Sequence, residues 1–509
     1  MTASTYKDAS TRGVFTHALA HALRINGALL LVPASTPLFT SDSWWCSLHY
    51  ITPAILCLAF GQVLIRKHPL IAEPNNRTGH IIITSVWALV MLVSSIPLIT
   101  LEGAGIVQGV FESVSGWTTT GLSIFDVTRL SMATLLWRAL MQLAGGAGLA
   151  ILFVVWSTLP GGSVFSRVEG RVLLVPQVRR SAMIVLRIYA SYLLVGTAAY
   201  MMAGLNSFDA FTHTCAAIST GGFSTKTASI GAWNSALVES ISIVLMILGS
   251  MNFLTVWLAV TGEWKSFLRN SELRVMTVAL VVTLPLLILG SAIPLYGETW
   301  KSVRVGIFEG VSALTTTGFS TVGYTDWNGL GIALMTVLML IGGAACSTAG
   351  GIKQIRIAIS FKLMWQSIRR YIAPQGTVSL VRVHDGRDYR TLRVDDFVDV
   401  SAFIILYLTT FAVMSILIAA HGHSVAFSFF EAASALGTVG LSIGITGTAT
   451  PDSILVVEII GMFLGRLEFF AVFVALSAAF RRRVRPDTSL LHPHAQPTAP
   501  RRYLRSETD

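Results

Sequence analysis

The chain has 509 residues, of which 53% are hydrophobic and only 12% are charged, and its mean hydropathy is +0.67. These values exclude an ordinary soluble domain and indicate a membrane protein with several spans. The net charge of +10 comes from Lys and Arg clusters between the apolar runs, which is the pattern that orients a membrane protein and argues against a nucleic-acid partner.

Residues 1–79 are expected to form an N-terminal region with two helices. The first apolar run, Ile25 to Phe39, is only about 15 residues long, so a signal-peptide core and a short spanning helix both fit it. We favour the helix, because no small-residue cleavage site follows. With a cytoplasmic amino terminus, the main basic clusters then all fall on one side of the membrane. A second span is expected from Ser47 to Ile65.

Starting with a third span, Ile81 to Leu101, one order of segments occurs four times. Each unit has a span, an apolar segment too short to cross the membrane and return as helix, and another span. The short segments are Gly105–Asp126, Phe208–Phe223, Val303–Phe319 and Val425–Leu441. Each contains a glycine that follows small or hydroxyl residues, and these glycines are 101, 96 and 122 residues apart. A spacing near 100 residues indicates four copies of one unit. The glycines are Gly121, Gly222, Gly318 and Gly440.

The expected fold class is an all-α polytopic membrane protein, with four pseudo-symmetric helix–pore loop–helix repeats around a central pore and two N-terminal helices. The repeats are expected at residues 80–160, 161–262, 263–362 and 396–480. A cytoplasmic linker, 363–395, contains the alternating stretch Val378–Val383, which predicts a short strand or hairpin. The basic cytoplasmic tail, 481–509, is rich in Pro and Arg and is expected to be disordered.

Backbone that enters a bilayer and turns back has to face protein or a water-filled path, because unpaired polar groups are costly in lipid. Four such segments therefore predict one shared path. Their inward legs should be helices whose carboxyl ends favour a cation, followed by carbonyl oxygens that replace its hydration shell. Such a filter suits a weakly hydrated monovalent ion, and potassium is the obvious choice. The expected ion-binding residues are Thr119, Thr120, Gly121, Thr220, Gly221, Gly222, Thr316, Thr317, Gly318, Thr438, Val439 and Gly440.

An acidic residue precedes the glycine by nine positions in three units, as Glu112, Glu309 and Glu431, and His213 takes this place in the second. At the rise of a helix this is roughly 13 Å, too far to coordinate an ion in the filter. Either these carboxylates attract cations in a vestibule, or they are buried anchors that bind backbone amides at the helix start. We favour the anchors.

A glycine-rich stretch, Gly342 to Gly351, interrupts the long apolar run of the third unit. A helix there would cost roughly 1 kcal/mol per glycine, and irregular backbone at this depth requires a cavity. The stretch therefore predicts an intramembrane loop directly below the filter; a glycine-rich helix packed on a neighbour is the alternative. The candidate gate residues in it are Gly342, Gly343, Ser347, Thr348, Gly350 and Gly351.

Arg466 lies inside the apolar run Ile454–Phe480. A cation at that depth costs at least about 2.5 kcal/mol and normally faces water or the protein interior. We expect it to act with the loop as a gate, as an electrostatic barrier in the path; a structural ion pair with Glu458 or Glu468 is the alternative. For Asn252 in the second unit, lining the cavity and bonding across helices stay equally open.

The four segments resemble those of the Trk/Ktr/HKT potassium transporter superfamily, and the chain is most similar to the TrkH-type membrane subunit. The resemblance covers nearly the whole chain and includes the stretch after each short segment: Gly145–Gly148, Gly249–Phe253, Gly342–Lys353 and Gly465–Glu468. It implies a homodimer, a gating role for the third stretch, and a cytoplasmic ring of TrkA-type nucleotide-binding regulatory subunits.

The same resemblance bears on ion selectivity. In the family, serine at the first filter position accompanies sodium permeation, so Gly121 implies potassium selectivity. The second and fourth units depart from the triple threonine, with Ser219-Thr220-Gly221 and Gly437-Thr438-Val439, which leaves the fourfold symmetry approximate.

The expected function is potassium uptake across the bacterial inner membrane, gated by the loop and by a cytoplasmic regulatory subunit, with both termini cytoplasmic. The alternative is an inverted-repeat secondary transporter of another small cation, although all four units here enter from the same side. The chain holds no catalytic constellation and is not expected to be an enzyme. K⁺ is the expected transported ion, membrane lipid is an expected contact, and neither an organic cofactor nor nucleic acid is expected.

Overall fold

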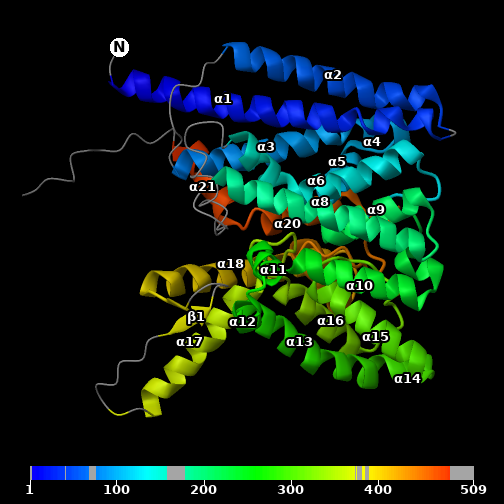
Figure 1. Cartoon of the computed structure of the whole chain (residues 1–509), viewed down its shortest axis with the longest axis vertical. Helices are drawn as coiled ribbons and strands as arrows, with labels where there is room; N and C mark the ends of the chain where they lie inside the picture. Colours follow the sequence, from blue (N-terminus) through cyan, green and yellow to red (C-terminus); the bar gives the residue numbers. More distant parts are fainter. Residues whose placement is uncertain are drawn as a thin grey trace, which may run out of the picture.

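The computed structural model describes residues 3–40, 42–67, 76–156, 178–372, 374, 381–384 and 389–481. Its regular structure is almost entirely helical (Figure 1). Helices α1 (Ala3–Leu30) and α2 (Trp44–Lys67) lie side by side along one edge of the molecule and are connected by the short helix η1 (Pro33–Leu38). The sequence tail from residue 482 onward lies outside the described residues.

The first apolar span begins earlier than predicted. It runs from Gly13 to Leu38, whereas the sequence placed its start at Ile25. The preceding stretch is rich in alanine, a strong helix former, and its polar His17 is only 8% exposed. The stem of Arg24 lies against Gly61 of α2, where a Cβ would be 2.8 Å from Arg24 Cγ. The polar residues that masked this part of the span are thus packed against neighbouring helices.

The remainder of the chain forms four consecutive groups of helices. The first group is α3 (Asn76–Ser94), α4 (Ile96–Glu102), α5 (Ile106–Trp117) and α6 (Met132–Trp156). The second group is α8 (Val178–Met202), α9 (Ser207–Ile218), η2 (Ser229–Trp233), α10 (Ala236–Ser250), α11 (Phe253–Val260) and α12 (Trp264–Arg269). The third group is α13 (Ser271–Leu287), η3 (Ile288–Ala292), α14 (Ile293–Tyr296), α15 (Thr299–Leu314), α16 (Gly329–Ile341) and α17 (Gln354–Ile372). The fourth group is α18 (Val394–Ala419), α19 (Val425–Leu436), α20 (Asp452–Arg466) and α21 (Phe470–Arg481).

The described helices have the lengths and surfaces of a multi-pass membrane protein. Six are long and apolar enough to cross a membrane, and the number rises to eight if each of two bent pairs counts as one span. Large apolar side chains such as Leu194, Val281 and Ile405 are 66–73% exposed. Such exposure suits lipid, since water would disfavour so much apolar surface.

Two runs that the sequence predicted as continuous spans are sharply bent. Helices α10 and α11 meet at 109°, and α20 and α21 meet at 104°. At the first break Asn252 leaves the helical conformation and its side chain caps α11, accepting a hydrogen bond from the amide of Leu254 at 2.9 Å. At the second break Glu468 and Phe469 both have positive φ, 55° and 56°. Hydropathy averaged over a run does not register either event.

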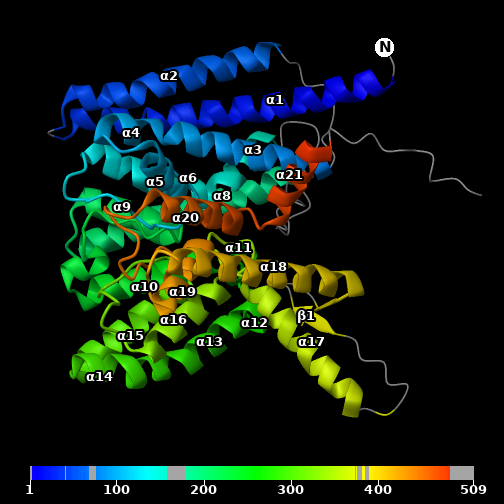
Figure 2. The ribbon, with the colours of Figure 1, turned by 180° about the vertical axis from the view of Figure 1, so that it is seen from behind.

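One short helix in each group, namely α5, α9, α15 and α19, occupies the centre of a closed arrangement. The helix after each short helix packs on the short helix of the next group: α6 on α9, α10 on α15, and α16 on α19. Helix α20 of the fourth group packs on α5 of the first and so closes the circle; Figure 2 shows α20 beside α5. The four groups therefore surround one axis in chain order.

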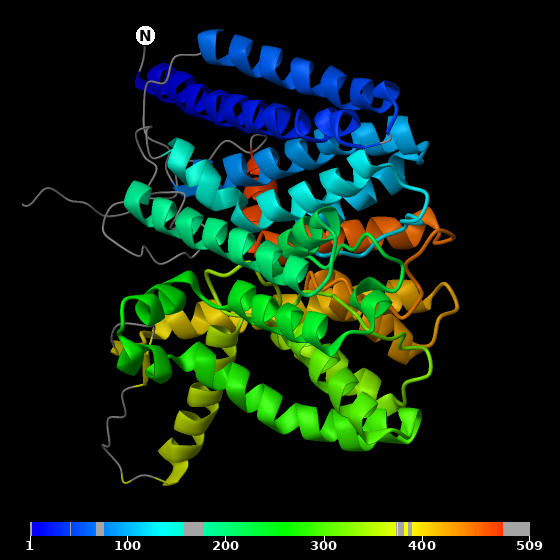
Figure 3. The same cartoon turned by 45° about the vertical axis from the view of Figure 1, so that its right-hand side comes forward.

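A small hairpin connects the third and fourth groups. Strands β1 (Arg382–His384) and β2 (Tyr389–Thr391) pair antiparallel, with Val383 opposite Arg390. The sequence predicted a strand or hairpin slightly earlier, and residues 375–380 of that stretch lie outside the described residues. Helix α17 projects away from the body on the edge opposite α1 and α2, as Figures 1 and 3 show.

Candidate functional site

The short helices all end in the same unusual conformation. The second residue after each helix is a threonine with positive φ, between 50° and 57°: Thr119, Thr220, Thr316 and Thr438. For a β-branched residue this is rare, and a left-handed residue costs roughly 1–2 kcal/mol. Such strain persists only where the surrounding structure imposes it. Each threonine starts a three-residue stretch that we call a ring segment: residues 119–121, 220–222, 316–318 and 438–440.

Backbone hydrogen bonds hold the start of every ring segment against its own helix. In the first group, the amides of Thr118, Thr119 and Thr120 donate to Val114, Gly116 and Ser115, over 2.8–3.1 Å. The same three bonds recur at equivalent positions in the other three groups. Because these amides donate to carbonyls of the preceding helix, the carbonyl groups of the segments are left for other partners.

The glycines that end the ring segments require glycine for two reasons. Their φ values are 91°, 75°, 79° and 95°, a region that side chains disfavour. In addition, a Cβ on each would lie 2.0–2.2 Å from a carbonyl oxygen of the next group. The pairs are Gly121 with Gly221 O, Gly222 with Thr317 O, Gly318 with Val439 O, and Gly440 with Thr120 O. The four segments therefore form a closed ring of mutually contacting backbone.

A hollow of about 560 Å³ lies on one face of this ring. All four ring glycines line it, together with a serine two residues after each glycine: Ser123, Ser224, Ser320 and Ser442. Lys226 also lines it; its side chain is 45% exposed and pairs with Asp209 at 3.3 Å. The four sequence-predicted glycines thus come together at the floor of one shared hollow, which we call the vestibule.

The second ring segment is supported differently from the other three. In the first group Ser115 Oγ accepts a hydrogen bond from the amide of Gly121 at 3.1 Å and donates to Leu122 O at 2.6 Å. The second group has Ala216 at the equivalent position. There Gln142 of α6 donates to Gly221 O at 2.5 Å and accepts from the amide of Phe223 at 3.2 Å.

Gln142 also explains why the second segment has glycine where two others have threonine. A Cβ on Gly221 would lie 2.5 Å from Gln142 Cδ. The glutamine side chain therefore occupies the space that a threonine would need. Sequence analysis recorded this departure but assigned no role to Gln142, whose position 79 residues away gave no signal.

The buried glutamates anchor the chain that follows the ring, as the favoured interpretation expected, although not at the helix start. Glu112, Glu309 and Glu431 are fully buried. Each accepts the backbone amide three residues beyond its ring glycine, those of Ile124 at 3.2 Å, Thr321 at 2.8 Å and Ile443 at 3.1 Å. In the second group His213 shares a hydrogen bond with Ser224 at 2.9 Å.

Glu112 has an additional partner in α6. Arg138 Nε donates to Glu112 Oε1 at 2.8 Å, and the arginine is only 2% exposed. Its guanidinium lies 3.9 Å from the centroid of the Phe223 ring. Removing one partner of a buried pair of this kind is strongly destabilising, so the pair holds α5 against α6, and the contact of Arg138 with Phe223 adds a connection to the second group.

A loop separates α16 from α17, and we call residues 342–353 the glycine-rich loop. The prediction of irregular backbone is confirmed, and the alternative of a packed helix is wrong. The two ends of the loop lie close together. The amide of Gly343 donates to Gly350 O at 3.3 Å, and a Cβ on Gly342 would be 2.2 Å from that oxygen. Gly351, at the second end, has a positive φ of 79°. Within the loop, Ser347 Oγ donates to Ala344 O at 2.6 Å.

The glycine-rich loop touches the threonines that begin three ring segments. Gly350 donates its amide to Thr316 Oγ1 at 2.8 Å, and Thr220 Oγ1 donates to Thr348 Oγ1 at 3.1 Å. A Cβ on Gly350 would lie 2.2 Å from Thr438 Oγ1. Since the vestibule is lined by the glycines at the other end of the segments, the loop lies on the opposite face of the ring.

Two cations lie at this loop. Arg466 donates to Thr348 O at 2.7 Å and to Gly145 O of α6 at 2.6 Å. Lys353, only 8% exposed, donates from Nζ to the carbonyl of Ala349. Of the two glutamates considered as partners of Arg466, Glu468 pairs with Arg356 at 2.6 Å. Glu458 accepts a hydrogen bond from Thr446 at 2.7 Å. Sequence analysis missed Lys353, although a lysine within apolar sequence is itself a signal.

A buried carboxylate connects the loop to the bent second span. Glu272, at the start of α13, accepts the amide of Ala345 at 2.6 Å and Asn252 Nδ2 at 3.1 Å. Asn252 thus bonds across helices, which settles the two alternatives left open for it. Glu272 was also missed by sequence analysis, because nothing in its own surroundings distinguishes it from a polar residue at a helix start.

Comparison with known proteins identifies the family. Residues 49–482 match the model of the TrkH family, described as a cation transport protein. The chain belongs to the TrkH family. It is therefore a transport protein of the membrane and not an enzyme.

Relatives of the TrkH family match over most of their length. The chain is 31% identical to the Trk system potassium uptake protein TrkG of Escherichia coli K12, covering 92% of this chain and 98% of that protein. It is 29% identical to the Trk system potassium uptake protein TrkH of Halomonas elongata, covering 91% and 99%. The crystal structure of the potassium transporter TrkH from Vibrio parahaemolyticus superimposes with a TM-score of 0.81 at 26% identity, covering 92% of this chain and 99% of that one.

Proposed function

We propose that this protein takes up potassium across the membrane through the closed ring of residues 119–121, 220–222, 316–318 and 438–440. The observation that carries this proposal is the cyclic contact of each ring glycine with a carbonyl of the next group. The amides of this strained backbone donate to the preceding helices. Carbonyl oxygens of the ring can therefore replace the hydration water of a weakly hydrated ion. Relatives named as potassium uptake proteins support the choice of ion.

The glycine-rich loop and Arg466 form the gate in this proposal. The loop contacts the face of the ring opposite the vestibule, through Thr316 and Thr220. Arg466 and Lys353 bring two positive charges to that face, and a cation leaving the ring would meet their repulsion. Opening requires the loop to leave the ring and the Arg466 bonds to break.

Further features of the proposal follow the family resemblance. The protein acts as a homodimer in the bacterial inner membrane, with both termini cytoplasmic and a TrkA-type nucleotide-binding ring as its regulatory partner. The four transport units correspond to residues 80–160, 161–262, 263–362 and 396–480. The cytoplasmic side carries most of the basic residues, in keeping with the positive-inside pattern.

Growth of a potassium-uptake-deficient bacterium at limiting potassium tests the proposal. With the regulatory subunit co-expressed, the wild-type chain should restore growth, and Gly121→Ser should restore it less well and admit sodium. Gly329→Ser is the matched control, because Gly329 has open space around it and does not line the vestibule. Failure of the wild type to restore growth, with protein present in the membrane, would count against potassium uptake.

A further inference from the structure

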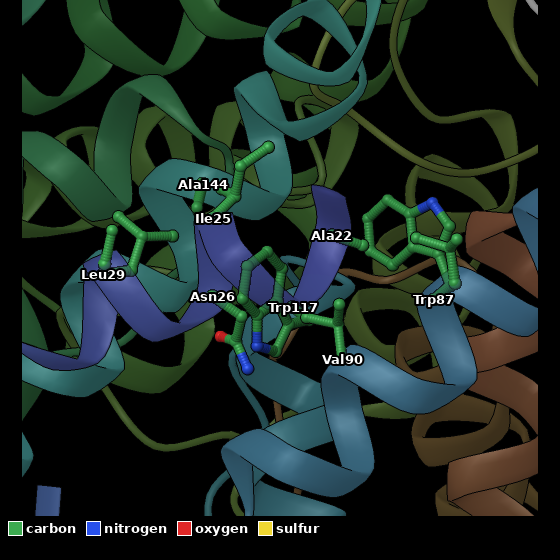
Figure 4. A pocket seen from close by; sticks show the side chains of 10 residues that line it. Ala22, Ile25, Asn26, Leu29, Trp87, Val90, Trp117 and Ala144 are labelled. Carbon is green, nitrogen blue, oxygen red and sulfur yellow. The ribbon is translucent and has the colours of Figure 1, made fainter. Parts of the chain in front are cut away.

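A cavity of about 310 Å³ lies between α1 and the first group of helices. Its walls are almost entirely apolar, and it includes the side chains of Trp87 and Trp117 (Figure 4). Protein interiors are normally packed without voids of this size. An apolar cavity of roughly 150 Å³ stays dry and holds benzene, so this one has room for a body of about two fused rings.

Among the described residues that line the cavity, Asn26, Trp87 and Trp117 carry polar side-chain atoms, and Asn26 Nδ2 and Trp87 Nε1 are donors without a hydrogen-bond partner. Trp117 Nε1 donates to Ser94 Oγ at 2.9 Å, and Ser94 Oγ donates to Asn26 Oδ1 at 3.1 Å. This relay uses the oxygen of Asn26 and leaves its Nδ2 without a hydrogen-bond partner among the described residues. Asn26 is 1% exposed, and its amide lies beside the Trp117 indole in Figure 4. A buried donor without a partner is costly, so a ligand that accepts from it would be favoured.

The depth of Asn26 restricts the source of such an acceptor. Asn26 lies about midway along the apolar segment Gly13–Leu38, which places it near the centre of a hydrocarbon core roughly 30 Å thick. Ala28, which also lines the cavity, is exposed on the outer surface of α1, so the cavity is reachable from the bilayer. The ester carbonyls of phospholipids lie at the bilayer surface, about 15 Å away. The acceptor must belong to a molecule dissolved within the hydrocarbon core.

We propose that this cavity binds a membrane-dissolved quinone or a similar apolar ring compound with a carbonyl group. The carbonyl accepts a hydrogen bond from Asn26 Nδ2, and the ring body lies beside Trp87 and Trp117. Aromatic walls suit a flat ring, and none of the described residues that line the cavity is charged.

The ligand would lie next to two residues that contact Arg466 or adjoin one of its hydrogen-bond acceptors, namely Trp87 and Ala144. The guanidinium of Arg466 is 5.8 Å from the centroid of the Trp87 ring. Ala144, another lining residue, immediately precedes Gly145, whose carbonyl accepts from Arg466. Occupancy of the cavity therefore bears on the same contacts that hold Arg466 against the glycine-rich loop.

A matched pair of probes tests the site in purified protein in lipid nanodiscs. Menadione carries two ring carbonyls, and 2-methylnaphthalene has nearly the same shape without an acceptor. Binding is measured by equilibrium dialysis between protein-loaded and empty nanodiscs of equal lipid content, with each probe quantified by chromatography. Menadione should bind about tenfold more tightly than 2-methylnaphthalene, the effect of satisfying one buried donor.

Two variants and one control separate the donor from the cavity. Asn26→Leu should reduce the preference for menadione, with the Trp87 indole N–H as the remaining donor, and should leave 2-methylnaphthalene binding within about twofold. The variant also removes the acceptor of Ser94 Oγ, a loss that both probes share. Ala28→Phe should weaken both probes by obstructing access. Ile55→Phe, at an exposed position of α2 that does not line the cavity, should change neither. Equal affinity of the wild type for the two probes would overturn the role of Asn26. Unchanged binding in Ala28→Phe would overturn the location. Neither result depends on transport activity.

Discussion

Arg466 Nη1 donates a hydrogen bond to the carbonyl oxygen of Thr348 at 2.7 Å, and so the fourth group of helices holds the glycine-rich loop that belongs to the third. Its Nη2 reaches Gly145 O in the first group at 2.6 Å. One side chain therefore connects three groups at the face of the ring opposite the vestibule.

Replacement of Arg466 by alanine should raise potassium flux by roughly tenfold, equivalent to removing about 1.4 kcal/mol of electrostatic repulsion. Arg466→Lys should give an intermediate result, because the charge is kept but one ammonium cannot span both carbonyls with the geometry of a guanidinium. Uptake of rubidium-86 into vesicles containing the purified protein measures this. Unchanged uptake by a correctly folded Arg466→Ala protein would remove the barrier role.

Gly121→Ser should lower the preference for potassium over sodium by about tenfold, an energy of about 1.4 kcal/mol. The new Cβ would start 2.1 Å from Gly221 O, so the ring has to widen or shift there. Bi-ionic reversal potentials, or competition of sodium with rubidium uptake, report the change. Gly329→Ser should behave as the wild type; if it loses selectivity to the same degree, the loss is not specific to the ring.

Gln142 and Gly221 should be energetically coupled. Gly221→Thr alone should be damaging, because the added side chain meets Gln142 Cδ at 2.5 Å. Gln142→Ala alone leaves the buried amide of Phe223 without its acceptor, at a cost of about 1–3 kcal/mol. In the double variant the clash is relieved, so the coupling energy should be about 1 kcal/mol or more in favour of the pair. Additive effects on thermal stability in detergent would contradict a shared space.

Glu272→Gln should lower the free energy of unfolding by about 1–3 kcal/mol, because a carboxamide offers one acceptor where two donors, Ala345 N and Asn252 Nδ2, now bond. Adding Asn252→Asp should restore much of the loss, since the glutamine amide can then donate to the new carboxylate. The aspartate still caps α11 at Leu254. Thermal unfolding followed by intrinsic fluorescence gives the comparison, and Asn252→Asp alone, which places two carboxylates together, should be less stable than the double variant.

The spacing of the ring glycines and the irregular backbone of the glycine-rich loop follow from the sequence because they depend on residue type. The spacing of glycines can be read directly from the sequence, and a glycine-rich stretch at membrane depth rarely forms a helix. The left-handed threonines do not follow, since Thr119 and its equivalents are β-branched and their own preferences oppose positive φ. Their conformation is held by backbone hydrogen bonds to the preceding helix and by contacts of the ring with the neighbouring groups.

The bends and the supporting contacts were also out of reach of sequence reasoning. The break at Asn252 depends on a cap and on Glu272, neither of which changes the mean hydropathy of the run. Gln142 reaches Gly221 only once α6 packs on α9. The start of the first span was misjudged because polarity was counted along the chain, whereas His17 is buried by neighbouring helices.

The packing of α20 on α5 has a consequence for biosynthesis. The circle of helices is completed by the last group to leave the ribosome. Thr120 is synthesised early, and its carbonyl contacts Gly440 only after the fourth group has been made. A chain arrested before the fourth group has three quarters of a ring and no Arg466. Partially made protein in the membrane therefore has an incomplete ring, and Arg466 is inserted only after the last part of the ring.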